Sequence, residues 1–290
     1  MNRISVNHAS TFRWQLFQDV LKSAKLGFDG IGLVRHKVED FGEVETVDLI
    51  HEMQIGVSSL SWVGGFTGCA GMSFDECVQD AKRTIQFAAA VEAECLIVHP
   101  GSRNSHTWGH ATRLLTNALD ELIPFAQDYD VTLALEPMAG EISRQWSIME
   151  VEPTIKFVAQ YSEYELGLVL DLFHMGECSS LLEDLESLLP RIKLVQLGDT
   201  KTQMTGEQNR CRLGAGRIPI SEWISRLDSI GYEGTYEVEL HGFDVECEPY
   251  CDLLEHSLQY VKRCLQTNNT DKPIGPKPSL SVPHRSRPKQ

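Results

Sequence analysis

Short apolar runs alternate with longer amphipathic runs along most of the chain, and this alternation limits the folds open to it. Eight short runs carry β-branched or aliphatic residues beside a turn signal, which is typical of β-strands. The expected strands span residues 4–7, 30–34, 56–60, 95–99, 132–136, 167–171, 193–196 and 236–239. Helical periodicity marks residues 75–91, 113–129, 153–159, 180–189 and 220–230 between them.

Strands that alternate with helices predict a parallel sheet joined by right-handed crossovers. Eight such units within residues 1–265 predict an α/β protein with a closed (β/α)8 TIM barrel. A doubly wound open sheet would need a glycine-rich turn after its first strand, and residues 5–14 contain no glycine. The late Gly214-Ala215-Gly216 turn does not match GxGxxG, which argues against a dinucleotide-binding site.

Charge divides the chain into two parts. The 290 residues hold 26 Lys and Arg against 41 Asp and Glu, a net charge of −15. Residues 266–290 hold five basic residues and one acidic residue, so this segment is +4 and the remaining body is −19. We expect a barrel over residues 1–265 and a disordered, basic, Pro-rich tail over residues 266–290, because the tail has few large apolar residues. The acidic body argues against binding to nucleic acid or to anionic membranes.

The eight cysteines form no CxxC pair, and no apolar run approaches the roughly 18 residues of a membrane span. The first residues lead directly into a strand-like run rather than a secretory signal. We therefore expect a reduced, cytoplasmic protein.

Four consecutive expected strands end on a side chain that can bind a metal. These side chains are Glu136, Asp171, Gln196 and Glu239. The carboxyl ends of barrel strands converge on one face, and neighbouring strands lie about 4.8 Å apart. Three carboxylates and an amide oxygen form a hard set of donors. The pattern predicts a divalent metal site that favours Mn or Mg, with Co or Zn as alternatives.

Other polar and aromatic residues follow the same strand ends. His99 ends the fourth strand and His174 lies three residues beyond Asp171, so either can contact a substrate or be a structural histidine. Trp62 follows the third strand and would give an aromatic wall to a sugar site, unless it only anchors a loop. Arg212 precedes the Gly214–Gly216 turn and would bind a hydroxyl, carboxylate or phosphate group, unless it is solvated.

Several of these motifs together resemble one known family. They are LALEP at 133–137, VLDLFH at 169–174, VQLGD at 195–199, GAGRI at 214–218 and EVE at 237–239. Over roughly residues 3–262 the chain resembles the xylose isomerase-like barrels, which include sugar isomerases and epimerases, inosose dehydratase-like enzymes and, more distantly, endonuclease IV. The resemblance implies a metal held by positions 136, 171, 196 and 239. Family members usually have histidine at position 196, and glutamine there gives a lyase more weight.

The resemblance implies a reaction at a carbon next to a carbonyl. Glu136 and Glu239 would act as base and acid, and His99 would assist as a catalytic acid. We predict a metal-dependent isomerase or epimerase that acts on a keto-sugar or cyclitol through an enediolate. The alternative is a dehydratase of a keto-polyol, similar to inosose or 3-dehydroshikimate dehydratase. The acidic body disfavours an endonuclease IV-like enzyme. Assembly into a homo-oligomer stays open.

Overall fold

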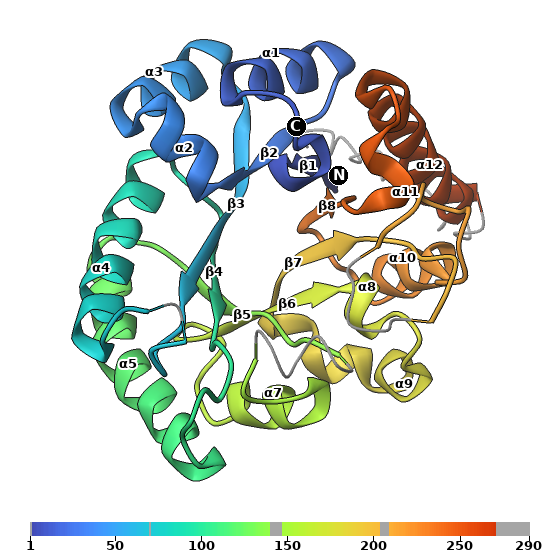
Figure 1. Ribbon diagram of the computed structural model, residues 1–290. Helices are drawn as coiled ribbons and strands as arrows, with labels where there is room; N and C mark the ends of the chain where they lie inside the picture. Colours follow the sequence, from blue (N-terminus) through green and yellow to red (C-terminus); the bar gives the residue numbers. More distant parts are fainter. Residues whose placement is uncertain (1, 70, 140–146, 204–208, 271–290) are drawn as a thin grey trace, which may run out of the picture.

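The computed structural model describes residues 2–69, 71–139, 147–203 and 209–270. Within them, parallel strands β1 to β8 follow one another around a closed barrel, and helices surround the barrel on the outside (Figure 1). The barrel closes where β1 pairs with β8, with Ser5 opposite Glu237. The predicted (β/α)8 TIM barrel is confirmed.

The elements follow the expected alternation. The strands are β1 (Arg3–Asn7), β2 (Gly30–Val34), β3 (Gly56–Gly64), β4 (Leu96–His99), β5 (Leu133–Leu135), β6 (Gly167–Asp171), β7 (Ile192–Leu197) and β8 (Thr235–Val238). The α-helices are α1 (Leu16–Leu26), α2 (Arg35–Phe41), α3 (Glu43–Met53), α4 (Phe74–Ala90), α5 (Trp108–Asp128), α7 (Val151–Val158), α8 (Leu172–Met175), α9 (Ser179–Leu188), α10 (Ile220–Ser229), α11 (Phe243–Glu246) and α12 (Tyr250–Thr270). Two 3-10 helices are η1 (His8–Thr11) and η2 (Leu189–Arg191).

Some element boundaries differ from those expected. Strand β3 continues to Gly64, so Trp62 lies within it rather than in a loop. Helix α5 begins at Trp108 instead of residue 113, because the Thr107 side chain caps it by accepting from the His110 amide. Helix α12 continues to Thr270, past the expected start of the tail at residue 266. Residues 271–290 of that expected tail lie outside the described residues.

Side chains alternate between the barrel interior and the helices, as the two-residue period of a strand requires. An apolar cluster fills the interior between β4 and β7, and consists of Cys95, Ile97, Ala134, Val169 and Leu194. Their strand neighbours Leu96, Leu133 and Leu168 pack outward against the helices. Two residues beyond the interior residues Ala134, Val169 and Leu194 come Glu136, Asp171 and Gln196. The period therefore points these polar side chains to the same inner face.

The opposite side of the interior, near β8, β1 and β3, is polar. Ser5, Ser58, Ser59 and Glu237 are all fully buried there. Gly32 on β2 leaves the space that this group needs: a Cβ atom at Gly32 would lie 2.5 Å from Glu237 Oε2 and 2.8 Å from Ser59 Oγ. The barrel thus has an apolar half and a buried polar half below its carboxyl-terminal face.

In the described part of the chain, no helix combines the length and hydrophobicity needed to span a bilayer.

Candidate active site at the carboxyl-terminal face of the barrel

A cavity of about 200 Å³ lies at the carboxyl ends of the strands. We call it the mouth cavity. Its lining residues are Asn7, Ala9, Val34, Ser61, Trp62, His99, Glu136, Met138, Gln196, Arg210, Glu239 and His241. Seven of the described strands, all except β6, contribute to this lining directly or through the residue that follows them. The cavity therefore occupies the place where barrel enzymes carry their active sites.

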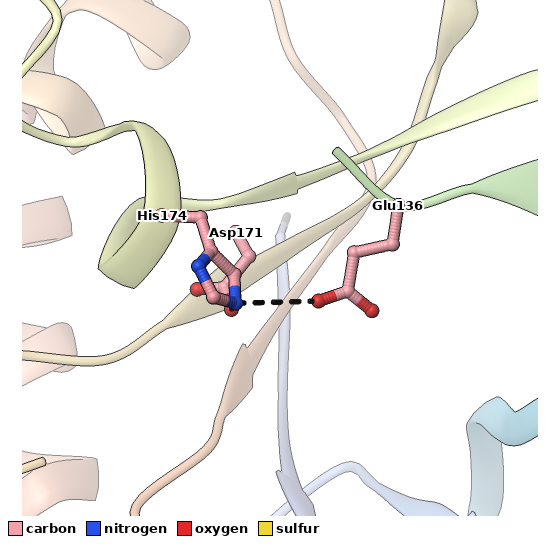
Figure 2. Close-up of side chains that lie close together, drawn as sticks. All are labelled: Glu136, Asp171 and His174. Atoms are coloured by element: carbon pink, nitrogen blue, oxygen red, sulfur yellow. Dashed lines mark ion pairs between the residues drawn. The ribbon is translucent and has the colours of Figure 1, made fainter. Parts of the chain in front are cut away.

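Glu136, Asp171 and His174 form a buried cluster beside this cavity (Figure 2). One ligand atom from each lies within 4.8 Å of the others. His174 Nε2 is 3.7 Å from Asp171 Oδ2 and 4.0 Å from Glu136 Oε1. Helix α8 sets this geometry. Asp171 caps the helix by accepting from the Phe173 amide at 2.8 Å. His174 follows one helical turn later, and its ring therefore lies beside the Asp171 carboxylate.

The hydrogen-bonding capacity of the buried His174 imidazole is unused in the described structure. Neither ring nitrogen of His174 has a hydrogen-bond partner among the described residues. Burial lowers the pKa of His174, although the carboxylates of Asp171 and Glu136 oppose this shift. A neutral imidazole of this kind is suited to binding a metal. His174 is predicted from the sequence to contact a substrate, yet it lies behind the cavity lining with its side chain fully buried.

His99 and Trp62 form one wall of the mouth cavity. His99 Nε2 lies 2.7 Å from Glu136 Oε2, and the Trp62 ring stacks on the imidazole at a centroid distance of 5.0 Å. Burial opposes ionisation of Glu136, but His99 and then His174 hold the pKa of Glu136 below its usual value. Gly64 permits the close approach of β3 and β4 here, since its φ is 144° and a Cβ atom would meet the His99 carbonyl oxygen.

Arg210 is a residue of the candidate site that the sequence analysis did not select. Its fully buried guanidinium lies 2.9 Å from Asp171 Oδ2 and 3.2 Å from Glu239 Oε2, and stacks over the Phe173 ring at 4.5 Å. Arg212, which the sequence favours as the substrate-binding arginine, pairs with Glu248 and does not line the mouth cavity.

The two arginines differ because of the backbone between them. An antiparallel bridge joins Cys211 to Asp199, just beyond β7, and the Arg210 amide donates to the His241 carbonyl oxygen at 2.9 Å. Residues on either side of Cys211 are thereby fixed in different surroundings. No motif in the sequence distinguishes Arg210 from Arg212, so only this long-range pairing selects the one that enters the site.

Buried acidic groups outnumber the buried basic group at the site. Glu136, Asp171 and Glu237 are buried, Glu239 beside them is 14% exposed, and Arg210 is the guanidinium among them. Burial raises the pKa of Glu239 to about 8, and the neighbouring Asp171, Glu136 and Glu237 add to the rise that Arg210 opposes. Converging carboxylates of this kind are relieved by a bound cation.

Gln196 also has a buried polar atom that a bound cation would satisfy. Its Nε2 donates to Glu237 Oε1 at 3.1 Å, while its buried Oε1 has no partner among the described residues. A buried acceptor without a partner is costly unless something binds to it. The oxygen of Gln196, the ring of His174 and the carboxylates together form a donor set that fits a divalent cation.

Comparisons with known proteins show the family of the chain. The chain belongs to the xylose isomerase-like TIM barrel family, whose model matches residues 20–264. An inosose isomerase of Halalkalibacterium halodurans is 25% identical over 249 residues, which cover 82% of this chain and 87% of that protein. An uncharacterized protein of Methanocaldococcus jannaschii, MJ1311, is 26% identical over 170 residues, which cover 57% of this chain and 55% of that protein. The chain therefore spans about half the length of that relative.

Solved structures share the fold. A crystal structure of the IolI protein with a bound zinc atom superposes with a TM-score of 0.78 and 19% sequence identity, covering 92% of this chain and 99% of that one. At this identity the likeness establishes the barrel and its topology.

Proposed function

We propose that this protein is a divalent-metal-dependent isomerase or epimerase of a keto-sugar or keto-cyclitol. The observation that carries the proposal is the buried excess of carboxylates at the barrel mouth, beside an aromatic wall formed by Trp62. The similarity to an inosose isomerase over most of both chains supports the substrate class. The mouth cavity holds one arginine, Arg210, among its described lining residues, which favours a neutral substrate over a highly phosphorylated one.

Glu136 and Asp171 would hold the metal, and His174 lies within reach of the same ion. Gln196 and Glu239 lie outside that three-residue cluster, line the mouth cavity beside it and would complete the set. When bound, a divalent ion polarises a substrate carbonyl and the adjacent hydroxyl, which lowers the energy of an enediolate. Mn or Mg suits the oxygen-rich part of the set, and the imidazole of His174 keeps Co and Zn as alternatives.

The carboxylates of Glu136 and Glu239, which directly follow β5 and β8, would move the proton. Glu136 removes the proton from the carbon next to the carbonyl, and His99 Nε2, at 2.7 Å, is placed to accept or return a proton through that carboxylate. Glu239 follows β8, three strands around the ring from β5, and would protonate the opposite face of the enediolate. Return to the opposite face gives an epimer, and return to the adjacent carbon gives the isomeric carbonyl compound.

The His99–Glu136 pair also supports a second candidate, a dehydratase of a keto-polyol. A protonated His99 could donate to a departing β-hydroxyl group while Glu136 holds the abstracted proton. Trp62 stacks on this imidazole and would keep bulk water from one of its faces. The same intermediate thus leads to loss of water if a leaving hydroxyl reaches His99.

One incubation separates the two candidates. The purified protein is supplied with Mn²⁺ and either an inosose or a neutral ketohexose in D₂O, and the reaction is followed by NMR and ultraviolet absorbance. Deuterium incorporation into an epimer or isomer supports the proposal, whereas growth of an enone absorbance assigns the dehydratase. Glu136→Gln should abolish either reaction, with a loss of about 10³-fold or more. If neither substrate class exchanges deuterium or loses water with any divalent metal, the proposed function is wrong.

A further inference from the structure

Glu237 is a buried carboxylate that the proposed chemistry does not use. It lies on β8 with no exposed surface. Four side chains donate to it: Asn7 Nδ2 at 2.8 Å, Ser58 Oγ at 2.6 Å, Ser59 Oγ at 2.8 Å and Gln196 Nε2 at 3.1 Å. The donors divide between its two oxygens. The serines bond to Oε2 and the two amides bond to Oε1.

The amide of Asn7 fixes Glu237 Oε1 as an acceptor. Asn7 Oδ1 accepts from the Ala9 backbone amide at 2.9 Å, so the Asn7 NH₂ group is the part that faces Glu237. Glu237 Oε1 already accepts from that NH₂ group. An oxygen that accepts from one amide can accept from a second, but it repels a second amide's carbonyl oxygen.

The orientation of Gln196 follows from this chain of hydrogen bonds. Gln196 must present its NH₂ group to Glu237, and its Oε1 then points away from Glu237. That oxygen is buried and has no partner among the described residues. Gln196 also lines the mouth cavity and pairs in register with Asp171 on the neighbouring strand. The free acceptor therefore belongs to the same level of the barrel as the carboxylate that we assign to the metal.

We propose that Glu237 is a positioning residue that makes Gln196 a metal ligand by locking its amide with the oxygen toward the cation. This inference rests on the proposed function, because it needs a cation at the site. The two ends of a glutamine amide have nearly the same shape, so the terminal torsion has two states of similar packing. One state offers an oxygen to the cation, and the other offers an NH₂ group that the cation repels. Glu237 removes the second state.

Glu237→Gln tests this role with little change in shape. The new amide can donate as well as accept, so it no longer dictates which end of Gln196 faces it. Loss of a residue that orients a metal ligand typically weakens metal binding by about 10- to 100-fold. We expect the Kd for Mn²⁺, measured by electron paramagnetic resonance of free Mn²⁺, to rise within this range.

Ser59→Ala is the matched control, since it removes a donor to the same carboxylate but leaves the Oε1 bond to Gln196 intact. We expect it to change the Kd for Mn²⁺ by less than about threefold. The decisive measurement is a double-mutant cycle that combines Glu237→Gln with Gln196→Ala. In that background Glu237→Gln should have no further effect on Mn²⁺ affinity, because there is no amide left to orient.

The outcomes separate this inference from the proposed function. If Glu237→Gln weakens Mn²⁺ binding equally with and without Gln196, Glu237 acts through general electrostatics and the inference is wrong. An unchanged Kd in the folded single variant overturns it as well. If the unmodified protein binds neither Mn²⁺ nor Zn²⁺, the proposed metal site itself fails. Circular dichroism checks folding, and Glu237→Asp, which keeps the charge but withdraws the oxygens by one methylene, replaces Glu237→Gln if that variant does not fold.

Discussion

At the scale of single residues, the site depends on which ionic groups are buried together. Arg210 is held between Asp171 and Glu239 with 1% of its side chain exposed. Removing one member of a buried pair leaves the other charge without compensation, which costs far more than the loss of an exposed pair. Two residues further on, Arg212 pairs with Glu248 at the surface. The stability cost of losing a buried arginine can therefore be compared with that of losing a partly exposed one in the same chain.

Arg210→Met should therefore destabilise the metal-free protein by about 3–5 kcal/mol. Arg212→Met should cost less than about 1 kcal/mol, because its ion pair is partly solvated. The free energy of unfolding, measured with urea in the presence of a chelator, checks both values. Similar losses in the two variants would show that Arg210 does not compensate the buried carboxylates.

At the scale of elements, η1 joins the first strand to the first helix through a buried polar group. Lys37 Nζ donates to the His8 and Thr11 carbonyl oxygens at 3.1 and 2.9 Å and to Asp19 Oδ2 at 2.7 Å. These contacts tie η1 to both α1 and α2. The His8 imidazole is buried beside them, and neither of its nitrogens has a hydrogen-bond partner among the described residues.

This buried imidazole should make the fold sensitive to acid. Burial, and then the charges of Lys37 and His36, hold the pKa of His8 well below its usual value; Asp19 Oδ2, 3.9 Å from Nε2, is the nearby acid. Below about pH 6.5 the unfolded chain binds a proton at His8 that the folded chain does not. The contribution of His8 to the free energy of unfolding therefore falls as the pH falls, by about 1.4 kcal/mol per pH unit, whereas burial raises the pKa of Asp19 to about 6 and gives a contribution of opposite sign.

His8→Phe removes the titrating group and keeps a ring of similar size. Relative to this variant, the unmodified protein should lose stability progressively from pH 6.5 to pH 5 in urea unfolding experiments. His51→Gln, at an exposed position in α3, serves as the control and should follow the unmodified protein. Parallel pH profiles for His8→Phe and the unmodified protein would contradict the prediction.

At the scale of the whole molecule, the barrel concentrates negative charge at one end of its axis. The chain carries a net charge of −15, and four of its acids converge at the carboxyl-terminal face. A cation that binds the folded barrel but not the unfolded chain stabilises the fold by mass action. If the proposed metal site binds a cation, metal binding and global stability are linked.

Addition of Mn²⁺ to the chelator-treated protein should raise its melting temperature. At a free Mn²⁺ concentration about 100 times the Kd, the expected stabilisation is about 2.7 kcal/mol. Asp171→Asn should remove most of this gain, and an equal ionic strength of KCl provides the control for screening. Differential scanning calorimetry gives the measurement. Equal melting temperatures in Mn²⁺ and KCl would refute a metal site that forms only in the folded barrel.

The alternation of strands and helices determined the fold and most of the candidate site. The two-residue period after Ala134, Val169 and Leu194 is local information, and it was enough to place Glu136, Asp171 and Gln196 on one inner face. His99 could be placed beside them in the same way, because it ends a strand with the same period.

Long-range pairing decided what local sequence could not. The sequence placed Gln196 with Glu239 as two strand ends, whereas the register of β7 and β8 pairs Gln196 with Glu237, two residues earlier. Closure of a barrel requires its strands to be staggered, and this stagger is a property of the whole ring rather than of any segment. The selection of Arg210 over Arg212 has the same origin in the Asp199–Cys211 bridge. The sequence by itself thus specified which residues face inward, and the closed barrel decided which of them meet.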